Sequence, residues 1–386
     1  MPRISPFPGL LFDPAIAGPL ETVTAPPYDV IGEEERRAFL SSSPHSVVHL
    51  DLSESSGQLD RYERAAHLLE RWRTEGALRT GASPLYYAYE MRFRLHARER
   101  RIRGLFCALE LEDWGGGVLP HERTMSGPVE DRLRLLRATR ANISAVYGTV
   151  AGPVPALASL LDGVTEHTPL CSVEDEEGIA HAMWAVAPDP AIAGWLEGEP
   201  MLIADGHHRY TTALRYRQER RAAEGAGPWD AVLALVVDAG TEAPPVLPFH
   251  RLVAGDRPVP EGVRVHDLQE ALAELDDDAL TVGVVTREAG GLVHLVATLE
   301  GVPPTVAALH DRVLGTETDG GAIRFTPDAA AAEAVVRAGT AAAAYLLPST
   351  TTDRIRAVVQ RGERLPQKST FFWPKPRTGM VMRALE

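Results

Sequence analysis

Residues 203–214 read IADGHHRYTTAL, and this stretch decides the fold around it. An apolar run that ends in Asp205 and Gly206 predicts a strand followed by a tight turn, because glycine adopts backbone conformations that other residues avoid. A basic helix is predicted to follow at 207–223. We expect Asp205 to cap the start of that helix, because aspartate is a preferred residue there.

His207, His208 and Arg209 begin the predicted helix. The start of a helix offers backbone N–H groups and the positive end of the helix dipole, and it therefore binds phosphate readily. The stretch thus predicts a phosphate-binding turn. The alternative is a capped helix whose polar residues face water. A zinc site on the two histidines is not favoured, because adjacent helical residues point about 100° apart.

The remaining pattern predicts a mixed α+β fold with more than one domain. Hydrophobic periodicity predicts helices at 58–72, 129–140, 329–336 and 352–361, and strands at 86–95, 102–111, 143–150, 201–204, 231–237, 280–285, 292–299 and 341–347. Hairpins and strand–helix alternation both occur in this order. The Gly- and Pro-rich stretches 240–248 and 255–262 are the best linker candidates. We therefore expect a catalytic region at 1–240, a smaller α+β domain at 241–366 and a tail at 367–386 that returns to the active site.

The composition indicates an acidic, globular protein. The 386 residues include 39 Lys plus Arg against 53 Asp plus Glu, a net charge of −14, and 45% are apolar. This charge argues against nucleic acid or an anionic membrane as a partner, because such surfaces bind concentrated positive charge. No apolar run approaches a membrane span, and the first residues lack a signal-peptide pattern. With Cys107 and Cys171 expected to be buried thiols, we predict a cytoplasmic location.

Lysine and asparagine are almost absent from the chain. Lys368 and Lys375 are the only lysines, and Asn142 is the only asparagine. Lysine is a compact point charge whereas arginine is a planar fork, so a site that needs the point charge resists the exchange of lysine for arginine. The alternative is that these two lysines remain by chance, but their position within eight residues of each other argues against it. Because Ser369 and Thr370 follow Lys368, the tail is a predicted second phosphate-binding element.

A second polar segment, at 119–125, reads LPHERTM. Glu122 follows an apolar strand and stands between a histidine and an arginine, where a carboxylate can be oriented for proton transfer. A surface ion pair is the plain alternative. Asn142, which offers a donor and an acceptor to a small ligand, ends the next helix. The arginines of that helix, at 132, 134, 137 and 140, are expected to form a partly solvated face.

Four segments together resemble a prokaryotic family of unknown function, domain of unknown function 1015. They read APPYDVI (25–31), HERT (121–124), ADGHHRY (204–210) and PQKST (366–370), and the resemblance spans nearly the whole chain. The DGHHR segment more distantly resembles the ParB and sulfiredoxin superfamily, whose members bind nucleotide phosphates at this turn. The resemblance implies a ParB/sulfiredoxin-like core around the turn with an additional α+β domain.

The family is similar to pyrophosphate-dependent serine kinases, which implies phosphoryl transfer to the hydroxyl of free L-serine. The chain has no P-loop or dinucleotide-binding motif, which suits pyrophosphate as donor, with a nucleoside di- or triphosphate as the alternative. Threonine and homoserine remain open as acceptors. The rival functions are a nucleotide-binding regulator without net chemistry, a DNA-associated nuclease and a small-phosphoester hydrolase. The sequence does not indicate an oligomeric state.

The resemblance and the motifs assign candidate roles to individual residues. Asp205 or Glu122 would accept the serine proton, with Asp205 favoured, and His207 would assist. Mg²⁺ would bridge the phosphate oxygens, with Asp205 as a ligand. The phosphate-binding candidates are His207, His208, Arg209, Lys368, Ser369, Thr370 and Lys375. The substrate-binding candidates are Tyr28, Asp29, Arg123, Thr124, Arg140, Asn142 and Tyr210.

Overall fold

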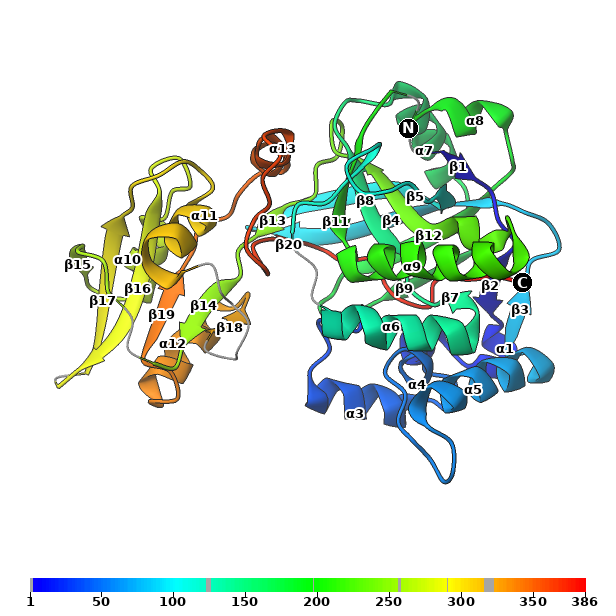
Figure 1. Cartoon of the computed structure of the whole chain (residues 1–386), viewed down its shortest axis with the longest axis horizontal. Coiled ribbons are helices and arrows are strands. Elements are labelled where there is room, and N and C mark those ends of the chain that lie inside the picture. Colours follow the sequence, from blue (N-terminus) through cyan, green and yellow to red (C-terminus); the bar gives the residue numbers. More distant parts are fainter. Residues whose placement is uncertain (1–2, 123–125, 197, 256–257, 290, 316–322) are drawn as a thin grey trace. The chain divides into compact units, whose positions relative to one another are not determined.

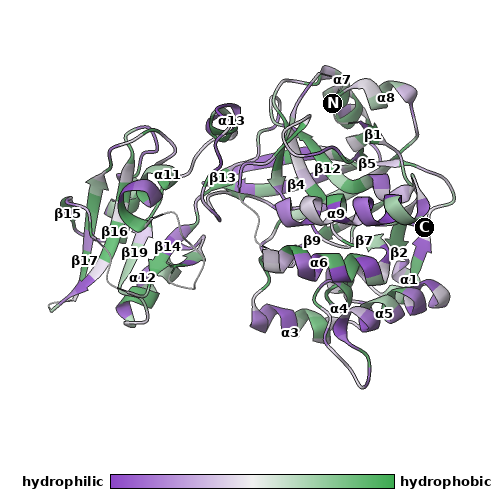
Figure 2. Ribbon diagram, in the orientation of Figure 1, coloured by the Kyte–Doolittle hydropathy of each residue, from purple (hydrophilic) through white to green (hydrophobic). Residues whose placement is uncertain are grey.

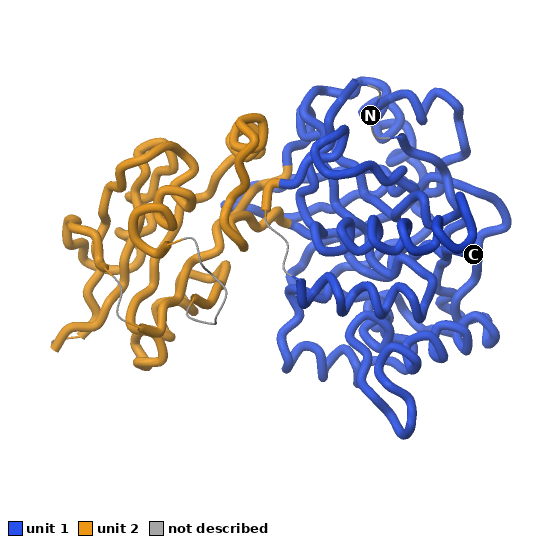
Figure 3. Tube along the Cα trace, viewed as in Figure 1, with its two compact units in different colours: residues 1–120, 124–243, 374–386 blue, residues 121–123, 244–373 orange. Residues whose placement is uncertain are grey.

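The computed structural model describes residues 3–122, 126–196, 198–255, 258–289, 291–315 and 323–386. The chain forms two compact units, coloured separately in Figure 3. Unit 1 contains residues 1–120, 124–243 and 374–386, and unit 2 contains residues 121–123 and 244–373. The division into 1–240, 241–366 and 367–386 stays a prediction, because it concerns the roles of these segments as well as their packing.

Unit 1 is built on a nine-stranded sheet with the order β6-β11-β8-β12-β5-β4-β10-β9, and β1 pairs with β5 outside this path (Figure 1). The strands are β1 (Ile4–Ser5), β4 (Tyr86–Leu95), β5 (Arg98–Glu110), β6 (Val118–Leu119), β8 (Val146–Val150), β9 (Cys171–Glu174), β10 (Ala180–Val186), β11 (Met201–Asp205) and β12 (Ala231–Asp238). Most pairs are antiparallel, but β12 pairs with β8 and β11 pairs with β6 in parallel. This mixed pairing places the end of β11 beside β8.

The helices of unit 1 include a packed pair, α6 and α9, that run side by side in Figure 1. The helices are α1 (Pro14–Ala17), α2 (Leu20–Val23), α3 (Glu33–Ser42), α4 (Val48–Asp51), α5 (Arg61–Glu75), α6 (Ser126–Thr139), α7 (Pro155–Thr165), α8 (Pro190–Gly194), α9 (His207–Glu224) and the 3₁₀ turn η1 (Pro228–Asp230). Leu133 and Leu136 of α6 pack with Tyr216 of α9 in a buried cluster. This cluster fixes α6 against α9.

A small sheet brings the end of the chain back into unit 1. Its order is β3-β2-β21-β7, with β2 at Gly9–Phe12, β3 at Leu78–Thr80, β7 at Ala141–Asn142 and β21 at Met382–Ala384. β21 pairs antiparallel with both β2 and β7. The segment just before β21 is therefore held within unit 1.

Unit 2 contains a six-stranded sheet with the order β15-β17-β16-β19-β14-β18 and a short pair, β13-β20. Its elements are β13 (Val246–Leu247), β14 (His250–Val253), β15 (Val263–Val265), α10 (Leu268–Ala273), β16 (Thr281–Glu288), β17 (Gly291–Thr298), α11 (Thr305–Leu309), the π-helical turn η2 (His310–Leu314), β18 (Ile323–Thr326), α12 (Ala329–Arg337), β19 (Ala343–Leu346), α13 (Thr352–Gln360) and β20 (Phe371–Phe372). Val285, Ala344 and Val336 belong to a separate buried core. Unit 2 thus has a core of its own.

The predicted α+β class is confirmed, and every helix and strand predicted from periodicity has a counterpart within a few residues of the expected bounds. The apolar run 231–237 forms β12, which is buried along nearly its whole length, and Figure 2 shows hydrophobic residues along β12 and β16. Apolar residues on both faces are the reason for this burial. The ParB/sulfiredoxin-like character of the core stays a prediction.

The cysteines and the hydropathy of the helices bear on the expected location. Both cysteines are free; Cys107 is buried, whereas Cys171 is half-buried, so the expectation of two buried thiols is fully met only by Cys107. Burial raises the pKa of Cys171 to about 11. Among the described residues, none of the helices combines the length and the apolar character that crossing a membrane requires.

A buried histidine of unit 2 predicts a loss of stability in acid. The Nδ1 atom of His250 accepts a hydrogen bond from the Leu347 amide at 3.1 Å, and burial, aided by the charge of Arg251, lowers the pKa of His250 from 6.5 to about 4. Between these two values the unfolded chain binds the proton and the folded chain does not, so stability falls as the pH drops through this window. His250→Asn, which keeps an acceptor, removes this loss.

We expect the wild type to lose about 2 kcal/mol of stability relative to His250→Asn between pH 7 and pH 5, measured by denaturant unfolding. His266→Asn, at an exposed histidine of unit 2, is the matched control. If the difference in unfolding free energy between wild type and His250→Asn were the same at pH 7 and pH 5, this assignment would be contradicted.

Candidate active site

The strand-to-helix turn lies where the sequence places it, but its cap differs. β11 ends at Asp205, Gly206 has a left-handed backbone with φ of 95°, and α9 begins at His207. The expectation that Asp205 caps the helix is wrong, because Gly206 occupies the cap position and no side chain caps α9. The pairing of β11 with β8 shifts register between Ile203 and Asp205. Asp205 is thus the last strand residue, and its carboxylate binds cations instead.

Lys375 is held between two carboxylates at this turn. Its Nζ atom lies 2.5 Å from Oδ1 of Asp205 and 2.9 Å from Oδ2 of Asp29, and the side chain is only 8% exposed. Burial opposes the charge of the ammonium, but the two carboxylates outweigh it and raise the pKa of Lys375 above its ordinary value. Two of the predicted residues, from the two ends of the chain, thus meet at the predicted turn.

Arg209 is the second cation bound to Asp205. Its Nη2 atom donates to Oδ2 of Asp205, and its Nη1 atom donates to the carbonyl of Ala145. The side chain is 9% exposed. Its Nε atom is buried and has no partner among the described residues. Both oxygens of Asp205 therefore contact a cation, and one donor of Arg209 remains for a ligand.

His207 and Tyr210 face an aromatic neighbour. The His207 ring stacks on Trp114, with ring centroids 6.1 Å apart, and Tyr210 lies against the same ring at 4.5 Å. The Tyr210 hydroxyl donates to the carbonyl of Glu112 at 2.7 Å and accepts from its amide at 3.0 Å. His208 is half-buried on the first turn of α9. The Tyr210 hydroxyl is thus bonded to the backbone of Glu112. Its substrate-binding role stays a prediction.

Tyr28 lies against one arginine of the row in α6. The Arg132 guanidinium sits 4.2 Å from the centre of the Tyr28 ring, and Nη1 of Arg132 donates to Oδ1 of Asp51 at 2.7 Å. Burial, together with the charge of Asp29, raises the pKa of Tyr28 to about 12 despite the nearby arginines. The expected solvated face is therefore correct only in part, since Arg132 is buried.

The other arginines of that row point to the surface. Arg134 pairs with Glu130, and Arg137 pairs with Glu219 of α9. Arg140 is exposed after the end of α6. Asn142, in contrast, is buried in β7, where its Oδ1 atom accepts a hydrogen bond from the Leu233 amide at 3.0 Å. This side chain lines a cavity beside Arg132 and Arg209, to which Arg140 does not contribute.

Glu122 belongs to a different cluster, which lies within unit 2. Its Oε1 atom accepts from the amides of Ser369 at 3.0 Å and Thr370 at 3.3 Å, and its Oε2 atom accepts from the amide of Lys368 at 3.3 Å. Buried His121 contacts the Thr370 hydroxyl at 2.6 Å. The carboxylate thus fills a nest of successive backbone N–H groups, a form of anion site.

Arg123 and Thr124 lie outside the described residues. Asp51, which sequence reasoning did not select, is buried at the end of α4 in the stretch SVVHLD (46–51). That stretch carries no motif, and only its approach to Arg132, distant in sequence, gives Asp51 a role.

The turn offers oxygen ligands suited to the predicted Mg²⁺. This ion takes one or two protein carboxylates and completes its shell with water and substrate phosphates. Asp205 and Asp29 are carboxylates of this kind, but Arg209 and Lys375 occupy both oxygens of Asp205 and Lys375 also contacts Asp29, so a magnesium site at the turn stays a prediction. Over the described ranges, no group of three or more His, Cys, Asp or Glu residues gathers in a metal-binding arrangement.

Comparison with known proteins identifies a family over most of the chain. Residues 4–334 match the family described as protein of unknown function (DUF1015). None of the curated proteins matches the chain.

Solved structures give more distant likenesses. A conserved hypothetical protein from Pyrococcus furiosus is 14% identical over 66% of this chain and 86% of that chain, with a TM-score of 0.35. A free serine kinase mutant in complex with AMP is 13% identical over 74% and 92%, with a TM-score of 0.42. A free serine kinase mutant in complex with ADP is 14% identical over 70% of this chain and 89% of that chain, with a TM-score of 0.37.

Gly206→Ala tests the geometry of the turn. The φ of 95° is strained for alanine, and the new Cβ would lie 3.0 Å from Nε of Arg209. We expect a loss of roughly 1–2 kcal/mol in unfolding free energy, together with displacement of Arg209 from Asp205 and a fall in activity. Gly76→Ala is the matched control, because Gly76 has a φ of 79° and ends α5, where the new Cβ would meet only Ile16. Equal activity in the two variants would contradict the role of the turn.

Lys375→Arg tests the need for a compact charge. The guanidinium is larger than the ammonium that now contacts Asp205 and Asp29, so the exchange should push these carboxylates apart. Misplacement of groups at a reaction centre by about 1 Å costs about 100-fold in rate, which is the loss in turnover we expect. Arg134→Lys, the reverse exchange at an exposed ion pair, should leave turnover unchanged. Turnover of Lys375→Arg equal to that of the wild type would contradict this expectation and favour survival of the lysine by chance.

Proposed function

The chain belongs to the DUF1015 family, and we propose that it is a phosphotransferase that phosphorylates the hydroxyl of free L-serine. Pyrophosphate is the lead donor, and a nucleoside di- or triphosphate is the alternative. The products are O-phospho-L-serine and either phosphate or the shortened nucleotide. Its free thiols suit a cytoplasmic enzyme.

One observation carries the proposal: the ammonium of Lys375 lies between Asp205 and Asp29 at the start of α9. Phosphoryl transfer needs little covalent help from the protein and depends on positioning and on stabilisation of negative charge. A compact cation, a helix N-terminus and an oriented carboxylate are the parts that such a reaction requires. All three occur at this one turn.

In the proposed step the serine hydroxyl oxygen attacks the terminal phosphorus of the donor. The new O–P bond forms as the bond between that phosphorus and the bridging oxygen breaks, and the departing phosphate keeps the electron pair. Asp205 orients the hydroxyl and accepts its proton. Since Arg209 and Lys375 hold the Asp205 carboxylate from two sides, its position is well defined.

The first turn of α9 supplies the contacts to the donor. His207 and His208 lie where backbone N–H groups and the helix dipole favour an anion. Lys375 and Arg209 supply the positive charge that offsets the charge of the transferred group. Mg²⁺, held in part by Asp205, would neutralise further charge on the donor oxygens. We assign this turn to a ParB/sulfiredoxin-like core.

Several candidate residues keep their predicted roles as proposals. Tyr28, Asp29 and Asn142 lie in unit 1 and are proposed to contact substrate. Lys368, Ser369 and Thr370 remain a proposed phosphate-binding element within unit 2. There the amides of the last two bind Glu122, and Lys368 lies 5.2 Å from the centre of the Phe249 ring. Glu122 is engaged by backbone amides and Asp205 by Lys375 and Arg209, so we favour Asp205 as the base because it stands at the phosphate turn.

Phosphorus NMR tests the proposal with the full-length protein, Mg²⁺ and L-serine, and with pyrophosphate, ADP and ATP in parallel samples. We expect a phosphoserine resonance with pyrophosphate. Phosphate release that does not depend on serine would indicate a hydrolase. Nucleotide binding without any product would indicate the regulator, and binding of DNA at low salt would support the nuclease. Each of these three results would overturn the proposal.

Asp205→Asn and Glu122→Gln separate the two candidate bases. Loss of a general base typically lowers the rate by about 10²- to 10⁴-fold, and we expect a loss of this size for Asp205→Asn. For Glu122→Gln we expect less than about a tenfold loss, because amide hydrogen bonds can persist to the remaining oxygen. Turnover measured with saturating serine and donor checks both values. A larger loss for Glu122→Gln would move the base to Glu122.

A further inference from the structure

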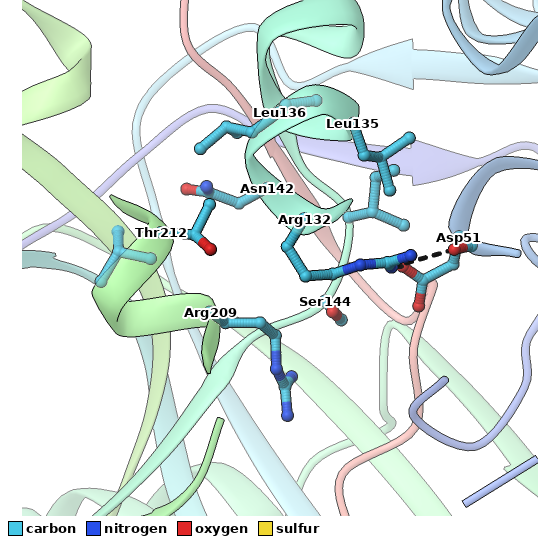
Figure 4. A pocket seen from close by; sticks show the side chains of 11 residues that line it. Asp51, Arg132, Leu135, Leu136, Asn142, Ser144, Arg209 and Thr212 are labelled. Carbon is cyan, nitrogen blue, oxygen red and sulfur yellow. Dashed lines mark hydrogen bonds and ion pairs between the residues drawn. The ribbon is translucent and has the colours of Figure 1, made fainter. Parts of the chain in front are cut away.

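A small cavity with both polar and apolar lining lies within unit 1 beside the proposed catalytic turn. It has a volume of about 50 Å³ and is bounded by α6, α9 and the start of the chain segment after α6 (Figure 4). The polar residues that line it are Asp51, Arg132, Asn142, Ser144, Arg209 and Thr212. In Figure 4, Arg132 reaches across from α6 to pair with Asp51, and Arg209 projects from α9.

Two charged side chains in the lining have unused hydrogen-bonding atoms. The Asp51 carboxylate pairs through Oδ1 with Arg132 at 2.7 Å, but its Oδ2 atom is buried without a partner in the described part of the chain. The Nε atom of Arg209 is likewise buried without a hydrogen-bond partner among the described residues. The exposed fractions of these side chains are 6% for Asp51 and 9% for Arg209. Buried polar groups left unpaired cost about 1–3 kcal/mol each, so both atoms indicate a bound polar molecule.

The two orphan atoms need opposite partners. Oδ2 of Asp51 is an acceptor and requires a donor, whereas Nε of Arg209 is a donor and requires an acceptor. The dianion of a phosphate monoester supplies only acceptors, and the negative charge of any phosphate would be repelled by Asp51. A molecule with an ammonium group and a carboxylate group satisfies both atoms. The pocket therefore fits a zwitterion better than it fits an anion.

The size of the cavity limits the ligand further. A volume of about 50 Å³ corresponds to roughly three or four water molecules, and because the cavity is partly open it can enclose the head of a small molecule whose remainder lies outside. The guanidinium of Arg132 is 9% exposed and already makes bonds to Asp51 and Asp131. It is thus held rigidly in the lining, as a recognition group should be.

We infer that this cavity binds the α-ammonium and α-carboxylate groups of a free amino acid, with the ammonium on Asp51 and the carboxylate on Arg209. This assignment rests on the proposed function, because it identifies the cavity as the acceptor site of the kinase. Arg209 links the two places, since its Nη2 atom binds Asp205 and the residue also lines the cavity, while its Nε atom is buried without a partner among the described residues. The side chain of a bound L-serine is thereby directed toward Asp205.

The inference predicts selectivity for free amino acids. L-Serine carries both charged groups, N-acetyl-L-serine lacks the ammonium and ethanolamine lacks the carboxylate. Burial raises the pKa of Asp51, and the two arginines only partly offset this effect. A ligand ammonium supplies the missing positive charge beside this carboxylate. The acceptor must therefore be a free amino acid rather than a serine within a peptide.

Binding of L-serine measured by calorimetry, without any phosphoryl donor, tests the inference. We expect Asp51→Asn to bind L-serine about 100-fold more weakly than the wild type, because a buried charge pair between protein and ligand is lost. N-Acetyl-L-serine and ethanolamine should bind the wild type at least about 100-fold more weakly than L-serine. Thermal unfolding confirms that each variant is folded.

Asp162→Asn is the matched control. Asp162 accepts from Nη1 of buried Arg103 at 2.7 Å, the same distance at which Asp51 accepts from Arg132, but it does not line the cavity. We expect its affinity for L-serine to equal that of the wild type. Equal affinities for Asp51→Asn and Asp162→Asn would overturn the inference.

The outcomes separate this inference from the proposed function. If L-serine binds through Asp51 and no donor yields phosphoserine, the amino-acid site stands and the kinase proposal fails. If phosphoserine forms while Asp51→Asn leaves the serine affinity and KM unchanged, the kinase proposal stands and the cavity is not the acceptor site. Phosphorylation of N-acetyl-L-serine as efficiently as L-serine would likewise overturn the inference.

Discussion

The pairing of Lys375 with Asp205 and Asp29 is the interaction on which the candidate site depends. It joins three segments that are far apart in sequence. Neighbouring contacts hold the same segments, since Ala25 and Thr378 exchange backbone hydrogen bonds and Nε of Arg377 donates to the Thr24 hydroxyl at 2.6 Å. Removing one partner from a buried charge pair typically costs about 3–5 kcal/mol, which applies here to Lys375 and Asp205 and less to the more exposed Asp29.

Arg209 extends that assembly toward the acceptor. Its two terminal nitrogens bind Asp205 and the Ala145 carbonyl, its Nε atom is buried without a partner in the described part of the chain, and the residue lines the cavity. A single rigid fork therefore sets the position of both the proposed base and the proposed amino-acid site. Substrate selection and chemistry are coupled in this account, because displacement of Arg209 disturbs both.

The sequence predicted local features well and distant contacts poorly. The strand that ends at Asp205, the glycine turn and the helix that begins at His207 follow from periodicity and turn chemistry, which act between neighbouring residues. The scarcity of lysine indicated that Lys375 matters, although it did not indicate which carboxylates bind it. Asp51 carries no signal in its own stretch, and Glu122 was assigned to proton transfer while its amide partners lie more than 240 residues away. Such contacts are set by tertiary packing, which periodicity does not describe.

The central claim is that the serine hydroxyl oxygen attacks phosphorus and becomes the bridging oxygen of phosphoserine. L-Serine labelled with ¹⁸O in its hydroxyl group tests this claim. The labelled serine is incubated with the protein, Mg²⁺ and pyrophosphate, and the masses of phosphoserine and phosphate are measured by mass spectrometry. The account predicts that the label stays in the phosphoserine and that the released phosphate is unlabelled. Label in the released phosphate, or the absence of phosphoserine, would contradict it.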